Sequence, residues 1–90
     1  MSNSVITVIG KDRVGIVYDV AKILAENQIN IVNISQQLMD DYFTMIILVD
    51  TTKCQKSFPE LTDLFLLESK NLALDIRLQH EQIFKAMHRI

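Results

Sequence analysis

Apolar positions along the first third of the chain change from the period of a strand to the period of a helix. Residues 5–9 (VITVI) are β-branched and apolar on both faces, which is typical of a central strand. After Gly10, which we expect to break the strand, apolar residues recur at helical spacing: Val17, Val20, Ala21, Leu24 and Ala25. Asp12 is the expected cap at the start of this helix, and Asn27 is its expected left-handed end.

The next two apolar segments predict a hairpin. In residues 29–39 the apolar phase slips near Ile31, which indicates a bulge or a bend, and polar residues follow one face as they do in an edge strand. Residues 42–49 end in five consecutive apolar residues, so we expect a central strand. Asp40 and Asp41 form the turn, which is too short for a crossover and therefore makes the pair antiparallel.

The second half of the chain repeats the helix-then-strand order. Ser57 and Glu60 have the spacing of a capping box, and the helix they open should end near Asn71. Residues 72–78 alternate between apolar and polar, which predicts a strand with one wet face. Residues 80–90 then predict a short helix with one apolar stripe: Ile83, Phe84, Met87 and Ile90. The order βαββαβ predicts an α+β fold, a four-stranded antiparallel sheet with two helices on one face and the first and third strands central.

Both central strands are apolar on both faces, but two helices can cover only one face of the sheet. In the third strand Met45 and Ile47 point to one side, while Ile46 and Leu48 point to the other. A large uncovered aliphatic patch is unusual in a soluble monomer. The C-terminal stripe spans about three turns and is too short to shield the whole face. We therefore expect both this helix and a second subunit to cover it, which predicts a homodimer.

Composition and charge narrow the classes of partner. The 90 residues suffice for one domain, 1–90, and carry a net charge of −2. The sequence pI of about 5.5 argues against nucleic acid, which attracts an excess of Lys and Arg. No apolar run approaches a membrane span, and the first residues lack the pattern of a signal peptide. The single cysteine, Cys54, fits a reducing compartment, so the expected localisation is cytoplasmic.

The loop after the first strand carries the most informative motif. Residues 10–17 (GKDRVGIV) resemble the ACT-domain pattern of an Asp or Asn followed by x-Pro-Gly, with Val14 where proline is usual. Asn30 and Ile31 also match that family's pattern. The sequence IFKAM at 83–87 resembles a group of stand-alone bacterial and archaeal ACT proteins, similar to the ACT halves of the glycine-cleavage repressor. The resemblance covers residues 5–79 and implies a ferredoxin-like ACT fold with a further C-terminal helix at 80–90.

The resemblance also implies a regulatory function. ACT domains of this kind pair side by side and bind an amino acid at the junction, without a cofactor. The residues it implies are Asp12, Arg13, Val14, Gly15 and Ile16 from one subunit, with Asn30 and Ile31 from its partner. Exposed N–H groups at a helix start suit a carboxylate, and Gly15 permits close approach. The simpler roles remain open: Asp12 as a plain cap, Gly15 for packing, Asn30 at a strand end, and Arg13 solvated.

The same fold also allows other functions. A pure dimerisation or protein-interaction domain would need no ligand. An acylphosphatase-like enzyme would use Arg13, but the central strand 42–49 lacks the asparagine of that pattern, so we expect no catalysis. His80 and His88 lack further ligands for a metal, and the sequence places no basic partner beside Cys54.

Overall fold

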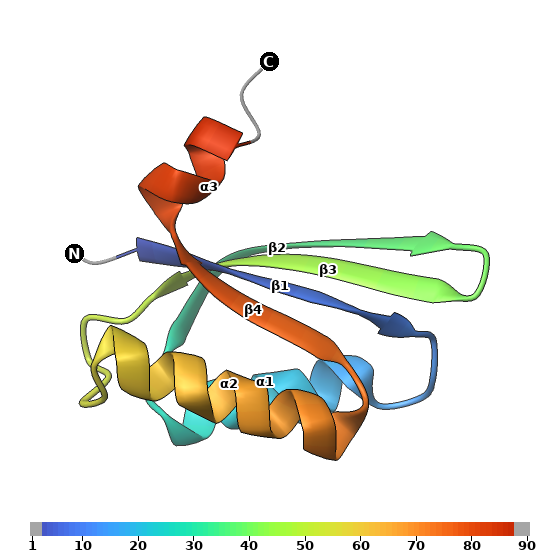
Figure 1. Cartoon of the computed structure of the whole chain (residues 1–90), viewed down its shortest axis with the longest axis horizontal. Helices are drawn as coiled ribbons and strands as arrows, with labels where there is room; N and C mark the ends of the chain where they lie inside the picture. Colours follow the sequence, from blue (N-terminus) through green and yellow to red (C-terminus); the bar gives the residue numbers. More distant parts are fainter. Residues whose placement is uncertain (1–2, 88–90) are drawn as a thin grey trace.

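The computed structural model describes residues 3–87 as one four-stranded sheet with two long helices and one short helix. The strand order is β2-β3-β1-β4, and all three neighbouring pairs are antiparallel. Figure 1 shows α1 and α2 on one face of the sheet and α3 on the other. The predicted α+β fold with central first and third strands is confirmed. The elements are β1 (Asn3–Lys11), α1 (Ile16–Glu26), β2 (Asn30–Met39), β3 (Tyr42–Asp50), α2 (Phe58–Leu72), β4 (Asp75–His80) and α3 (Glu81–Met87).

The hydrophobic core lies between the sheet and the two long helices. Ile6 and Val8 of β1 face the helices and are fully buried, as are Met45 and Ile47 of β3. Phe65 of α2 is the largest side chain buried against them. Burial of such side chains contributes about 1.5–3 kcal/mol each, so this layer holds the fold together.

The opposite face of the sheet is covered at one end only. Val5 points to this face but is 4% exposed, and α3 contacts β1 and β4 at that end. Farther along, Ile9 is 45% exposed and Ile46 is 36% exposed. The predicted division of the central strands into two apolar faces is confirmed. The side chain of Met87, and all of His88 and Ile90, lie outside the described part of the chain.

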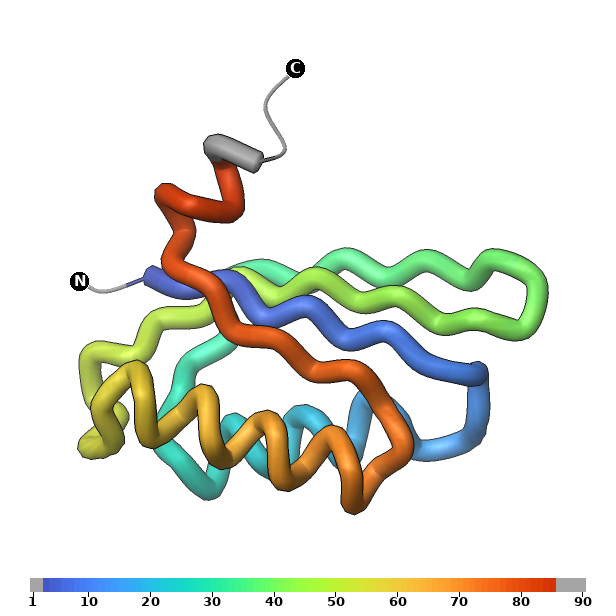
Figure 2. Tube along the Cα trace, in the orientation of Figure 1, coloured from blue at the N-terminus to red at the C-terminus, as the bar shows by residue number. Residues whose placement is uncertain are grey.

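Strand β2 forms one edge of the sheet, and all ten of its residues are exposed. The β2–β3 hairpin extends beyond the ends of the helices, as Figure 2 shows. The predicted bulge is confirmed, because the register with β3 shifts between Ile31 and Asn33. Ile31, Ile34 and Leu38 stay 38–58% exposed although they point to the helix side. This edge therefore presents both unpaired backbone groups and apolar side chains.

The start of α1 differs from the prediction. β1 continues through Gly10 to Lys11 because Gly10, with no Cβ, makes room for Leu74 on the same face. The N-cap of α1 is Gly15 rather than Asp12, and no side chain caps the helix. The left-handed residue at the far end is Gln28, with φ 57°, while Asn27 has φ −106°.

The second helix begins as predicted and ends one residue later. Ser57 accepts from the Glu60 N–H, and the Glu60 carboxylate accepts from the Ser57 N–H, which completes the capping box. The bond from the Ser57 backbone N–H is the main cause that lowers the pKa of Glu60 below its ordinary value of 4.5. Leu72 belongs to α2 rather than to the next strand, because Ala73 turns left-handed and β4 starts only at Asp75.

Candidate functional site

The loop at residues 12–15 connects the end of β1 to the start of α1. Gly15 adopts φ 91°, a conformation that side-chain-bearing residues rarely take. An added Cβ would meet only the Arg13 guanidinium, at 3.9 Å, so the glycine serves the backbone conformation and not tight packing. Because Gly15 has no side chain to cap α1, the first N–H groups of the helix stay open toward the loop.

The two charged residues of this loop have different surroundings. The Asp12 backbone N–H donates to the Asp41 carbonyl at 2.7 Å, which ties the loop to the β2–β3 turn. Its carboxylate is exposed and has no partner within residues 3–87. Asp12 also lines a hollow of about 280 Å³ beside Gln36 and Leu38. A free acid at an uncapped helix start suits the ammonium and carboxylate groups of a zwitterion.

Arg13 is not simply solvated. Its guanidinium forms an ion pair with Asp19 at 3.1 Å and donates to the carbonyls of Val14 and Leu72. The bond to Leu72 satisfies a carbonyl at the end of α2, so Arg13 fastens the loop to both helices. A guanidinium held in this way is poorly placed to bind a phosphate group, which weakens the hypothesis of an acylphosphatase-like enzyme. Val14 is 98% exposed.

Asn30 and Ile31 lie at the opposite end of the sheet from the Asp12 loop. Asn30 pairs with Asp50 at the far end of β3, whereas Met39 pairs with Tyr42, which in turn pairs with Lys11. Ten residues of strand span roughly 30 Å at about 3.3 Å per residue. One chain therefore cannot bring Asn30 and Asp12 to the same small ligand.

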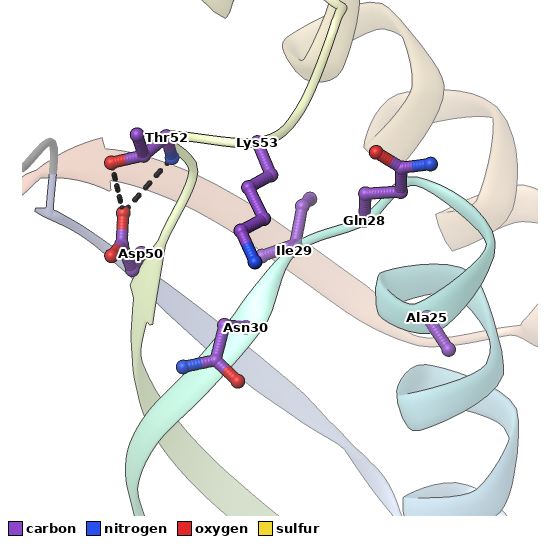
Figure 3. A pocket seen from close by; sticks show the side chains of 7 residues that line it. All are labelled: Ala25, Gln28, Ile29, Asn30, Asp50, Thr52 and Lys53. Carbon is purple, nitrogen blue, oxygen red and sulfur yellow. Dashed lines mark hydrogen bonds between the residues drawn. The ribbon is translucent and has the colours of Figure 1, made fainter.

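Asn30 lines a cavity of about 570 Å³ between the end of α1, the start of β2 and the loop after β3. Figure 3 shows its lining: Ala25, Gln28, Ile29, Asn30, Asp50, Thr52 and Lys53. Asp50 Oδ1 accepts from the Thr52 backbone N–H and from its hydroxyl. Sequence reasoning placed only Asn30 here and missed Gln28 and Lys53, which no motif marks and which only the fold brings beside Asn30.

The remaining candidate groups are occupied by packing. Cys54 is half-buried and packs against the core. The ring of His80 stacks on Phe58 with centroids 4.1 Å apart, and His88 lies outside the described residues. Within residues 3–87, no three His, Cys, Asp or Glu side chains gather as a metal site. No helix in this part of the chain is long and apolar enough to cross a membrane.

Comparison with known proteins decides the family. The family model for an ACT domain matches residues 3–79, which covers the elements from β1 to α2 and all of β4 except its last residue. The chain belongs to the ACT-domain family. This match confirms the family resemblance seen in the 10–17 motif. ACT domains are regulatory, ligand-binding modules.

Related sequences and solved structures match most or all of this chain. The chain is 81% identical over 90 residues to a UPF0237 protein of Neisseria meningitidis, with all of both chains covered. An ACT domain protein from Streptococcus pneumoniae is 38% identical, with a TM-score of 0.82 over 97% of this chain and 98% of that one. A protein assigned as a glycine cleavage system transcriptional repressor shares the fold, at 23% identity and TM-score 0.69 over 87% of this ACT domain and 44% of that chain.

Proposed function

We propose that this ACT domain is a cytoplasmic, non-catalytic regulatory module that binds an amino acid at the junction of a homodimer. Each site takes residues 12–16 from one subunit, and Asn30 with Ile31 from its partner. The ammonium group of the ligand lies on the Asp12 carboxylate, and the ligand carboxylate lies on the open N–H groups of the loop and of α1. The Asn30 amide donates and accepts at the edge.

The observation that carries this proposal is the separation of the two half-sites along one edge strand. Antiparallel pairing of β2 with the β2 of a second copy, around a two-fold axis, brings the beginning of each strand opposite the end of the other. The end of β2 lies beside the Asp12 loop through the Asp12–Asp41 hydrogen bond. Asn30 of one copy would thus approach Asp12 of the other, and the two-fold symmetry gives the dimer two complete sites.

The exposed edge supports the same pairing. All of β2 is accessible, and Ile31, Ile34 and Leu38 give it apolar contacts in addition to backbone hydrogen bonds. Adding a strand to such an edge is a common mode of association. A stable dimer buries about 800 Å² per subunit, so contacts beside the strand are also needed. Val14, at 98% exposure near the strand end, is placed to supply one.

A thermal-shift screen of the full chain against the twenty amino acids tests the function. A ligand that binds only the folded state raises Tm, with a stabilisation of about 2.7 kcal/mol at one hundred times Kd. We expect one amino acid, or a small related group, to raise Tm in a saturable manner. If none of the twenty does so at millimolar concentration, the chain is instead the ligand-free interaction domain considered above.

A further inference from the structure

The cavity beside Asn30 has features that the proposed dimer site does not use. It is formed within one chain, by the end of α1, the start of β2 and the loop after β3. The Asp12 loop lies at the other end of the sheet and contributes nothing to it. Of its polar side chains, Lys53 and Gln28 are as yet without a role.

Lys53 supplies a positive charge that forms no ion pair with any carboxylate of residues 3–87. Figure 3 shows its side chain extending from the loop toward Ile29 and Asn30. Within the described part of the chain its ammonium has neither an ion pair nor a hydrogen bond. The acid in the cavity, Asp50, is engaged through Oδ1 with Thr52 instead. The Nζ atom is therefore available to an external anion.

Gln28 and Asn30 line the same cavity, and Figure 3 shows their side-chain amides turned in opposite directions, so a shared ligand requires rotation of these exposed side chains. Neither has a hydrogen-bond partner within residues 3–87, and each can donate and accept. Gln28 holds a left-handed conformation, φ 57°, at the end of α1, where its N–H donates to Ala25 and the next N–H to Leu24. Glycine suits that position best. A glutamine there adds an amide-bearing side chain to the cavity lining at the expense of backbone strain.

We propose that this cavity binds a small molecule that carries a carboxylate, which pairs with Lys53 Nζ and accepts from the amides of Gln28 and Asn30. A short apolar part of the ligand lies against Ala25 and Ile29. The cavity holds one ammonium, and the Asp50 carboxylate repels additional negative charge, so the site favours a carboxylate over the more highly charged phosphate. This site shares Asn30 with the dimer site but needs neither Asp12 nor a second subunit.

Amide NMR of the full ¹⁵N-labelled chain tests this site directly. The probe is butyrate, with its neutral analogue butyramide and inorganic phosphate as comparisons at constant ionic strength and pH 7. We expect butyrate to shift the amide signals of Gln28, Asn30, Thr52 and Lys53 in a saturable manner. Butyramide and phosphate should each bind about tenfold more weakly, because charge-assisted hydrogen bonds contribute most of the affinity.

Variants separate this site from non-specific attraction. Lys53→Met should weaken butyrate binding about tenfold, and Lys53→Arg, which keeps the charge, should bind within a few-fold of the parent. Lys22→Met, which removes an exposed lysine of α1 outside the cavity, should change nothing. Equal butyrate affinity in Lys53→Met and parent overturns the proposal. Shifts confined to residues 12–16 also overturn it, while leaving the dimer site in place.

Discussion

At the scale of single residues, Gly15 and Asp12 exchange the roles that the sequence suggests. Asp and Gly both occur before helices, and Asp is the stronger side-chain cap. Here the left-handed turn at Gly15 starts the helix three residues after Asp12, so the carboxylate cannot reach the first turn. Asp12 does not cap the helix, so its carboxylate is free to bind a ligand.

The conformation of Gly15 gives the first prediction. Gly15→Ala must place a Cβ at φ 91°, and left-handed backbone costs roughly 1–2 kcal/mol for a residue with a side chain. We expect the free energy of unfolding in urea to fall by about that amount. Space is not the cause, because a Cβ there meets only the Arg13 guanidinium. An alanine variant as stable as the parent would show that the loop relaxes freely.

Glu60 gives a prediction about pH. Its folded pKa is lowered, chiefly by the hydrogen bond from the Ser57 backbone N–H. The ionised Glu60 side chain therefore stabilises the fold fully above pH 4.5, and this stabilisation is lost as the pH falls through the lower folded pKa. We expect Glu60→Gln to be less stable than the parent at pH 7, with the difference shrinking below pH 4.5. Urea unfolding at several pH values measures it. A difference that stays constant down to strongly acid pH would contradict the assignment.

At the scale of elements, the sequence predicted every strand and helix but not all of their ends. Period-two and helical patterns located the seven elements, and the Ile31 bulge and the Ser57 capping box were both correct. Errors came where a contact distant in sequence, or a backbone conformation unusual for its residue type, decides the boundary. β1 continues past Gly10 because Leu74 fills the space beside it, and nothing local to Gly10 indicates that. Leu72 stays in α2 because Ala73 turns left-handed, a conformation unusual for alanine.

The candidate site was predictable only in part for the same reason. The Asp12 loop follows one strand directly, so a local motif located it. The cavity around Asn30 joins the end of α1 to a loop more than twenty residues later in the chain. Gln28 and Lys53 have no recognisable spacing, and their proximity is a product of the sheet register.

Helix α3 gives a prediction at this scale. Truncation before Ile83 removes most of the cover over the far face at the end where Val5 lies. Uncovering a side chain such as Val5 should lower the free energy of unfolding by roughly 1–3 kcal/mol. Ile83→Ser, which changes a side chain already 51% exposed, is the milder control. Equal stability of the truncated and parent chains in urea would mean that α3 does not protect this face.

At the scale of the whole molecule, two surfaces are open to a second copy: the β2 edge and the uncovered part of the far face. The apolar pattern of the sequence predicted pairing through the far face, but only the β2 edge joins the two half-sites, so the proposal places the interface there. Ile34 lies near the middle of β2, so Ile34→Lys would place two ammonium groups side by side at the two-fold axis. We expect sedimentation at micromolar concentration to give roughly twice the 10.4 kDa chain mass for the parent, and the monomer mass for this variant.

Ile46→Lys is the matched control for that measurement. It puts the same charge on the far face, where Ile46 is 36% exposed, and leaves the β2 edge unchanged. It should remain a dimer. If Ile46→Lys is monomeric while Ile34→Lys stays dimeric, the subunits pair through the far face, and the shared ligand site is lost from the account.

The central claim is that Asp12 of one subunit and Asn30 of the other form one binding site. Mixing two variants that each lack binding tests it most directly. Asp12→Ala and Asn30→Ala should each abolish binding of the amino acid identified in the thermal-shift screen. When the two chains are unfolded and refolded together, each mixed dimer has one doubly altered site and one intact site. Calorimetry should then recover parent-like affinity at about a quarter of the sites, because half of the dimers are mixed and each has one intact site. If the mixture binds no better than either variant alone, Asp12 and Asn30 do not meet across a dimer and the shared site is wrong.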